Sequence, residues 1–256
     1  MEVTDKSVFP KIARMLKGCT GLFCVTGAGV SADSGLPTYR GEGGLYSDKM
    51  TEEGIPIEVA LAGDMLKENP AITWKYLSQI EARSRKASFN EAHRVLAEME
   101  KFFEVCILTQ NIDGFHTDAG SGNVIEIHGN IHDIFCTECG WKDTVKDFSS
   151  LVIPPLCPKC AGIVRPAVVF FGETLPYRAL QKLYYETDRP YDVFMSIGTT
   201  SVFPYIKEPI IRARNMKKAT IEINPDCTDV SDIVDIRVSM GASEALTGIW
   251  RAFNEL

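Results

Sequence analysis

The chain lacks two features that would point to nucleic acid or to a membrane. It has no excess of positive charge, because 27 Lys and Arg stand against 34 Asp and Glu among 256 residues, a net charge of -7. This balance predicts no general attraction to nucleic acid or to an anionic membrane, so a basic peptide is the better-matched macromolecular partner. The chain also lacks an uncharged apolar run of about 18 residues, which excludes an ordinary membrane-spanning helix.

A secretory signal and a disulfide framework are also missing. Residues 1–6 have neither a basic start nor an apolar stretch. Outside the cysteine pairs discussed below, the cysteines are Cys19, Cys24, Cys106 and Cys227, most of them in or near apolar runs. Buried free thiols suit a reducing compartment, so we expect these four to fill the core of a cytoplasmic protein.

Short apolar runs alternate with helical patterns along most of the chain, as in a parallel sheet covered by helices. A first helix at about 8–16 is stopped by Gly18, and a last helix carries Leu246, Ile249, Trp250 and Phe253 on one face. Strands are expected at 21–26, 105–109, 124–127, 193–197, 220–223 and 236–239. The pattern predicts an α/β fold with one doubly wound, Rossmann-like parallel sheet.

Two stretches interrupt this alternation. Residues 41–86 begin glycine-rich and become helical, with Ile72, Tyr76, Leu77 and Ile80 as an apolar stripe. Residues 131–166 are short and rich in Cys and Pro. We therefore predict a smaller lobe made of a helical insertion, 41–86, and a zinc ribbon, 131–166, beside a Rossmann-like domain made of 1–40, 87–130 and 167–256.

The ribbon carries two Cys-x-x-Cys pairs, Cys136/Cys139 and Cys157/Cys160, with 17 residues between them. Four thiolates at this spacing can surround one Zn²⁺ tetrahedrally and leave no open position for substrate. Zinc also supplies folding energy that so short a segment lacks. The sequence therefore predicts one structural zinc, with any catalysis left to nearby polar groups.

The segment 27–35, Gly-Ala-Gly-Val-Ser-Ala-Asp-Ser-Gly, follows the strand expected at 21–26. A glycine-rich turn that opens a helix suits a pyrophosphate, although the same pattern can be a plain strand-to-helix turn. A dehydrogenase would continue into a second strand with an acidic ribose ligand, whereas this chain runs into a loop at 36–44, which disfavours hydride transfer. Arg40 in that loop could face phosphate or could be a surface charge.

Polar side chains follow several predicted strands. Gln110, Asn111 and Asp113 could orient an amide ligand and stabilise a developing cation, or could form an Asx turn and helix cap. Asn224 is a candidate ribose ligand, and the hydroxyls at 199–201 could add contacts, although both segments could be capped turns.

His128 ends the run Val-Ile-Glu-Ile-His and precedes a glycine, so its ring could project into a cleft. An imidazole there can act as a general base. A lone histidine can equally be structural, which is our interpretation of His93, His116 and His132.

Together and in this order, these motifs resemble the sirtuin family of NAD-dependent protein lysine deacylases, in its prokaryotic type with a four-cysteine zinc module. The similarity covers roughly residues 7–255. The matching segments are 27–35, 37–40, 109–113, 128–129, both cysteine pairs, 169–173, 198–199 and 223–224.

The resemblance implies that the sheet domain binds NAD⁺ and that an acyl-lysine enters between the lobes. The acyl oxygen would attack C1′ of the nicotinamide ribose, with Asn111 and Asp113 positioning the reactants and His128 as the base; lysine and O-acyl-ADP-ribose would leave. The implied nucleotide contacts are Gly27, Ala28, Gly29, Asp33, Tyr39, Arg40, Gln110, Asn111, Ile112, Asp113, His128, Gly198, Thr199, Ser201, Asn224 and Ala242. The implied substrate contacts are Val169, Phe170, Phe171, Gly172 and Glu173, which would pair with the peptide by strand addition.

The chain departs from the family pattern in three places. Tyr39 stands where Phe is common, and Thr200 separates Thr199 from Ser201, so the hydroxyl contact is uncertain by one position. The desuccinylase branch holds a carboxylate with a Tyr and an Arg, and we expect Gln79 and Ala82 at those positions. A neutral pair cannot form that charge-assisted bond, which predicts an uncharged acyl group, acetyl first.

Two other functions compete with deacylation. A protein of the same fold could pass ADP-ribose from NAD⁺ to a protein side chain or to water. Retention of His128 together with 169–173 favours deacylation, because glycohydrolysis needs no acyl channel. A non-catalytic zinc-ribbon module that binds a nucleotide would leave Asn111, Asp113 and His128 without a joint purpose.

Overall fold

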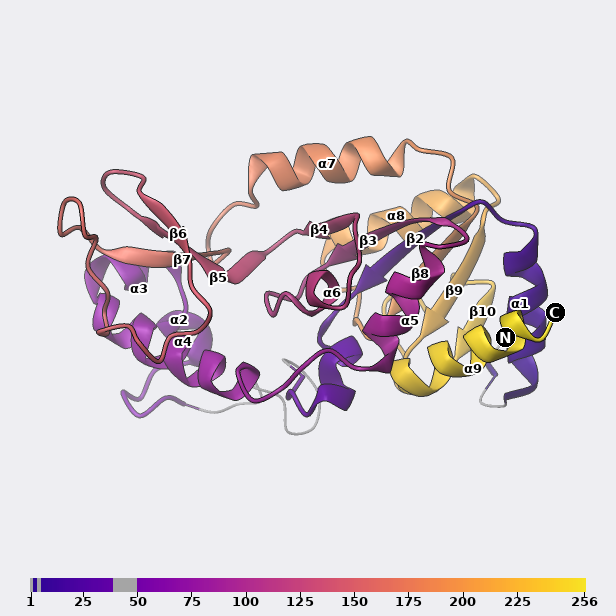
Figure 1. Cartoon of the computed structure of the whole chain (residues 1–256), viewed down its shortest axis with the longest axis horizontal. Coiled ribbons are helices and arrows are strands. Elements are labelled where there is room, and N and C mark those ends of the chain that lie inside the picture. Colours follow the sequence, from indigo (N-terminus) through magenta and orange to yellow (C-terminus); the bar gives the residue numbers. More distant parts are fainter. Residues whose placement is uncertain (1, 4–5, 39–49) are drawn as a thin grey trace.

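The chain forms a large parallel sheet with a smaller antiparallel sheet beside it, as the computed structural model of residues 2–3, 6–38 and 50–256 shows (Figure 1). Neighbouring strands of the large sheet all run parallel. Their spatial order is β1 (Glu2–Val3), β10 (Ile236–Val238), β9 (Ala219–Ile223), β8 (Val193–Ile197), β2 (Gly21–Thr26), β3 (Glu104–Thr109) and β4 (Val124–Glu126).

Successive side chains of the central strand β2 enter two different cores. Leu22 and Cys24 pack with α1 (Phe9–Lys17), α5 (Glu91–Met99) and α9 (Ala242–Asn254). Phe23 and Val25 pack on the other face, with α7 (Tyr177–Thr187) and α8 (Pro204–Asn215). A sheet covered on both faces explains why its strands are continuous apolar runs, and the predicted doubly wound fold is confirmed.

The order of the strands places a switch point next to β2. From β2 the chain moves to β3 and β4 on one side, and later returns to β8, β9 and β10 on the other. Loops that leave β2 and β8 therefore run in opposite directions at the carboxyl edge. Open α/β sheets bind ligands at such a point.

Most predicted elements agree with the structure to within a residue or two at each end, with some informative differences. The segment after β2 is a 3₁₀ helix, η2 (Ala28–Ser34), and β4 stops at Glu126, so His128 lies between strands. Two short elements, β1 and the 3₁₀ turn η1 (Lys6–Val8), were not predicted, whereas α6 (Phe115–Asp118) is the helix that the Asx-turn alternative for 110–113 implied. Among the free cysteines, Cys24 and Cys106 are buried as expected and Cys19 is half-buried, but the prediction for Cys227 is wrong because it is exposed.

The two interrupting stretches share one core. The antiparallel sheet has the order β6 (Lys142–Thr144), β5 (Gly129–Cys136) and β7 (Val164–Val168). Against it pack α2 (Ile57–Ala60), α3 (Gly63–Glu68) and α4 (Pro70–Ser84). Trp74 on α4 is fully buried beside Phe148, and its indole N–H donates to the carbonyl of Val164 at 2.9 Å.

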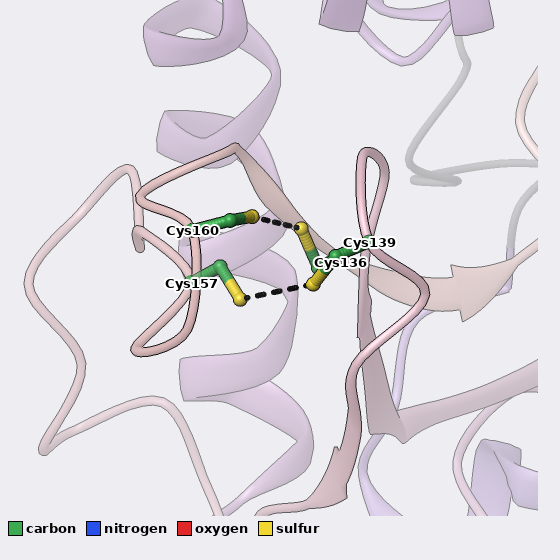
Figure 2. Close-up of side chains that lie close together, drawn as sticks. All are labelled: Cys136, Cys139, Cys157 and Cys160. Carbon is green, nitrogen blue, oxygen red and sulfur yellow. Dashed lines mark hydrogen bonds between the residues drawn. The ribbon is translucent and has the colours of Figure 1, made fainter.

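The four ribbon cysteines come together at the end of this lobe (Figure 2). All four sulfurs lie within 4.8 Å of one another, with 3.4 Å between Cys136 and Cys160 and 3.6 Å between Cys139 and Cys157. Zn–S bonds of about 2.3 Å in a tetrahedron separate the sulfurs by roughly 3.8 Å. The cluster is therefore suited to one zinc whose four positions are all taken by sulfur.

No helix in the described parts of the chain is long and apolar enough to cross a membrane.

Removal of zinc should unfold the ribbon while the large sheet stays folded. The apolar group beside the cluster is small, with Ile134 and Val164 as its buried aliphatic residues, so little else stabilises this end of the lobe. We expect a strong chelator to make residues 131–166 sensitive to limited proteolysis, and added Zn²⁺ to reverse the effect. A ribbon that stays protected after complete zinc release would contradict a structural role.

Gly129→Ala should destabilise the protein where β5 begins. Gly129 has φ of +82°, and a Cβ there would lie 1.8 Å from the carbonyl oxygen of Ala167 on β7. The left-handed backbone and the overlap together should lower the free energy of unfolding by about 3 kcal/mol. Gly120→Ala is the matched control, because Gly120 has φ of +100° but open space around it; about 1 kcal/mol is expected. Equal losses in urea unfolding would show that the contact with β7 does not matter.

Candidate active site

The loops after β2 and β8 touch through their backbones at the switch point. The amide of Gly29 donates to the carbonyl of Gly198 at 2.8 Å. A Cβ on Gly29 would lie 2.7 Å from the Cα of Gly198, and one on Gly27 would lie 2.8 Å from the Cβ of Thr199. Glycine is therefore required by this close approach, which leaves the loop segment 27–29 beside Gly198 and Thr199.

The end of β3 connects the same two loops. The side-chain amide of Gln110 donates to the hydroxyl of Thr199 at 2.7 Å. The amide of Asn111 donates to the carbonyl of Gly27 and to the hydroxyl of Ser31, each at 3.2 Å. Side chains predicted from separate motifs are thus brought together at one edge of the sheet.

A cavity opens between this edge and the smaller lobe. The side-chain oxygen of Asn111 is buried and has no hydrogen-bond partner within the described structure. Such an orphan acceptor is costly unless a ligand supplies a donor, as a carboxamide would. The lining residues are Ala28, Ser31, Leu36, Pro37, Asn111, Ile112, Asp113 and Ile131, together with Ile80, Arg83 and Ser84 from α4.

Asp113 is held at the wall of the cavity by two donors. The hydroxyl of Ser31 donates to one carboxyl oxygen at 2.8 Å, and the amide of Phe115 donates to the other at 3.1 Å. Burial raises the pKa of Asp113, and these two hydrogen bonds oppose the shift. The second bond is the Asx-type turn expected from the sequence, and it leaves Asp113 at the wall of the cavity.

Two buried histidines support this wall from behind. His93 Nε2 lies 3.5 Å from the hydroxyl of Ser31, and His116 Nε2 lies 3.0 Å from the hydroxyl of Thr26. Burial lowers the pKa of His93 to about 4 and that of His116 well below its usual value, so both are uncharged at neutral pH. The sequence indicated structural histidines correctly but did not reveal the contact between His93 and Ser31, whose position inside 27–35 was the available signal.

His128 lies between β4 and β5 with both ring nitrogens engaged. Nδ1 is 3.0 Å from the carbonyl oxygen of Gln110, and Nε2 is 2.8 Å from the hydroxyl of Tyr205 in the first turn of α8. Burial lowers the pKa of His128, and the bond to the Gln110 carbonyl opposes the shift. The imidazole is therefore neutral near pH 7. Tyr205 was not predicted, because nothing in the sequence around it marks a partner for His128.

Other predicted nucleotide contacts lie around the same edge. Asn224 donates to the carbonyl of Thr199 at 3.1 Å, while Ser201 is buried with its hydroxyl 3.2 Å from that of Ser196. The carboxylate of Asp33 accepts from the amide of Ser243 at 3.2 Å, which places it at the start of α9 beside the buried Ala242. Tyr39 and Arg40 lie outside the described residues.

The segment 169–173 runs from His128 toward the helices of the smaller lobe. The amide of Val169 donates to the carbonyl of His128 at 2.9 Å, and Phe171 pairs with residues 61 and 63 through its amide and carbonyl. The carboxylate of Glu173 faces Arg165, 2.6 Å away. Glu173 therefore holds the segment, while Gly172 at the turn is exposed.

The expected acyl-contacting pair on α4 needs correction. Gln79 is exposed, and neither Gln79 nor Ala82 lines the cavity; Ile80 and Arg83 do. Neighbouring residues of a helix differ in direction by about 100°, so a shift of one position turns a side chain off the cavity wall. The α4 side of this wall is therefore formed by the apolar Ile80 and the cationic Arg83 in place of the expected neutral pair.

Comparison with known proteins connects this geometry to a family. The model of the Sir2 family matches residues 27–204. The NAD-dependent protein deacylase 2 of Pseudomonas aeruginosa is 44% identical over 232 residues, covering 89% of this chain and 90% of that protein. The NAD-dependent protein deacylase of Aquifex aeolicus is 38% identical, covering 90% and 94%.

Solved structures agree with the sequence matches. A Sir2 homologue in complex with NAD superposes with a TM-score of 0.84 at 33% identity, covering 99% of this chain and 95% of that one. A Sir2 variant with a deacetylated p53 peptide and 3′-O-acetyl-ADP-ribose has a TM-score of 0.82 at 29% identity, covering 94% and 96%. The chain therefore belongs to the Sir2 family, as an enzyme of the NAD-dependent protein deacylase class.

Proposed function

We propose that this enzyme removes an uncharged acyl group from lysine side chains of a protein or peptide and transfers it to the ADP-ribose part of NAD⁺. The products are nicotinamide, the free lysine and O-acyl-ADP-ribose. The observation that carries the proposal is the bond between His128 Nδ1 and the carbonyl of Gln110. It ties a neutral imidazole to the residue directly before Asn111, and Asn111 lines the cavity and has a side-chain oxygen without a partner among the described residues.

The cavity would hold the nicotinamide. NAD⁺ supplies the electrophilic C1′ of the nicotinamide ribose, which takes the acyl oxygen as nicotinamide leaves. Asn111 offers the carboxamide an acceptor, and the carboxylate of Asp113 stabilises positive charge that develops beside it. Both groups are fixed in place by Ser31, so little reorganisation is needed during the reaction.

The two glycine loops would hold the phosphates and riboses. Gly27, Ala28 and Gly29 bring backbone close to the ligand beside Gly198, while Thr199, Ser201 and Asn224 supply polar groups at the ends of β8 and β9. Asp33 and Ala242 would contact the nucleotide at the start of α9. Tyr39 and Arg40, which lie outside the described residues, complete the proposed set.

His128 would take the proton of a ribose hydroxyl, which then attacks the acylated carbon. Its pKa is lowered by burial, so Nε2 is unprotonated at neutral pH and ready to accept a proton. The zinc stays outside this chemistry, because four thiolates fill its coordination sphere.

The substrate peptide would lie along 169–173 and be recognised mainly through its backbone. Phe171 is already paired with residues 61 and 63, so the exposed turn at Gly172 is the part of the segment open to a peptide.

A cytoplasmic location is also proposed, and the buried free thiols of Cys24 and Cys106 support it.

ADP-ribosyl transfer to protein and NAD⁺ hydrolysis are the alternatives, and one experiment separates all three. We expect the protein, incubated with NAD⁺ and an acetyl-lysine peptide, to give O-acetyl-ADP-ribose and deacetylated peptide in mass spectrometry. His128→Ala should keep the fold and zinc but lose about 100-fold or more in deacetylation, the usual contribution of a general base.

His132→Ala is the matched control for this loss, because His132 lies on β5 outside the cavity. It should keep near-normal activity. Free ADP-ribose or an ADP-ribosylated peptide as the main product would overturn the proposal, and a fully active His128→Ala protein would remove the assignment of the base.

Acetyl peptides should be turned over faster than succinyl peptides. The side chains of Ile80, Ile112 and Phe171 pack on the core that contains Phe170, so an acyl group here meets mainly apolar surface. A carboxylate buried in such surroundings loses its hydration, and Arg83 at the cavity wall is the cation that would have to offset this cost. We expect at least a tenfold difference in kcat/KM. Arg83→Ala should leave acetyl turnover within a few-fold; a succinyl preference that disappears in this variant would show that Arg83 anchors acidic acyl groups.

A further inference from the structure

The hydroxyl of Tyr205 is hydrogen-bonded to Nε2 of His128, the nitrogen that would accept the ribose proton in the proposed reaction. It lies 2.8 Å from Nε2. The Tyr205 ring is stacked on Phe203 with a centroid distance of 5.5 Å and an interplanar angle of 11°, and it packs against the core on the α7 and α8 face of the sheet. The hydroxyl is thus held against the imidazole by a packed aromatic pair.

The direction of both hydrogen bonds follows from the groups involved. The carbonyl oxygen of Gln110 can only accept, so Nδ1 of His128 carries the hydrogen. In a neutral imidazole Nε2 then has a lone pair and accepts from the hydroxyl of Tyr205. Burial disfavours the charged forms of both rings, lowering the pKa of His128 and raising that of Tyr205.

Charged groups on neighbouring elements are turned to other partners. Glu126, two residues before His128, accepts from the side-chain amide of Asn130 at 2.8 Å. Glu173, at the end of the segment that pairs with the His128 carbonyl, is bound by Arg165. Phe203 meets the imidazole edge-on, 6.2 Å away, and carries no charge. Among the described residues, Tyr205 is therefore the titratable side chain bonded to the His128 ring.

We propose that Tyr205 is a positioning residue for His128, whose phenol holds the imidazole with Nδ1 protonated and occupies the Nε2 lone pair until a ribose hydroxyl replaces it. The proposal rests on the proposed role of His128 as the base. The ribose oxygen then gives its proton to Nε2, the hydrogen on Nδ1 stays on that nitrogen and is still donated to the Gln110 carbonyl, and Tyr205 remains protonated throughout. His128 becomes an imidazolium, and the electron pair of the broken O–H bond stays on the ribose oxygen that attacks.

A measurable consequence distinguishes this role from simple packing. A hydrogen bond donated to the lone pair stabilises the neutral imidazole, so losing it should raise the pKa of His128. An ordinary hydrogen bond corresponds to a shift of about half a pH unit to one pH unit. Tyr205→Phe removes only the hydroxyl and keeps the ring that stacks on Phe203.

The test is an NMR titration of His128 in the zinc-loaded protein without NAD⁺ or peptide, with the resonance assigned by its loss in His128→Ala. We expect the pKa of His128 to rise by about half a unit to one unit in Tyr205→Phe. The acid limb of kcat/KM, which reports the free enzyme, should move to higher pH by the same amount. Tyr184→Phe on α7 is the matched control, since Tyr184 is 64% exposed, and should shift neither value.

An unchanged His128 pKa in a folded Tyr205→Phe protein would overturn the proposal. The ¹⁵N shifts of His128 in the unmodified protein give a second criterion that needs no variant: a hydrogen on Nε2 instead of Nδ1 in the neutral ring would equally overturn it. Neither the NMR titration nor the ¹⁵N measurement needs turnover. A protein that makes no O-acyl-ADP-ribose would therefore refute the proposed function and still leave the role of Tyr205 decided by the titration.

Discussion

The backbone contact between the loops after β2 and β8 is the constraint on which the site depends. The carbonyl of Gly198 accepts from the amide of Gly29, and a Cβ on Gly198 would lie 2.4 Å from the backbone nitrogen of Val30. Only residues without side chains allow the two loops to approach this closely. Because the loops touch, Thr199 comes within reach of Gln110, which directly follows β3, and the carboxyl ends of three neighbouring strands form one continuous polar edge.

Polar groups at this edge are stable because nearly all of them have partners inside the protein. Ser31 bonds both Asn111 and Asp113, and the uncharged ring of His93, which lies next to that of His116, is 3.5 Å from the hydroxyl of Ser31. A fully satisfied network is rigid, whereas a buried group left without a partner costs free energy. Two buried atoms here lack a partner among the described residues, Nδ1 of His116 and the side-chain oxygen of Asn111, and of these two residues Asn111 is the one that lines the cavity. An unpartnered acceptor on a residue of the cavity wall is thus a candidate contact for a ligand.

Local sequence patterns predicted the sheet, the cysteine cluster and the polar strand ends, because each depends on residues close together in the chain. Contacts across the chain were not accessible in this way: Ser31 and Asp113 are separated by 82 positions, and His128 and Tyr205 by 77. The error at Gln79 has a different cause, since a helix pattern gives an apolar stripe but does not say which residue meets a given ligand. The boundaries of the two units and the roles of the individual site residues stay predictions.

The zinc site and His128, the proposed base, are connected through one strand. β5 begins at Gly129, directly after His128, and ends at Cys136, a zinc ligand. Its partner β7 leads into the segment whose first amide, that of Val169, bonds the carbonyl of His128. A metal at one end of this pair of strands therefore fixes the strand that begins directly after His128 at the other end. A closed zinc site can influence catalysis only through such geometry, because it has no position for substrate. The zinc site and the cavity edge are therefore separate sites that both depend on the paired strands β5 and β7.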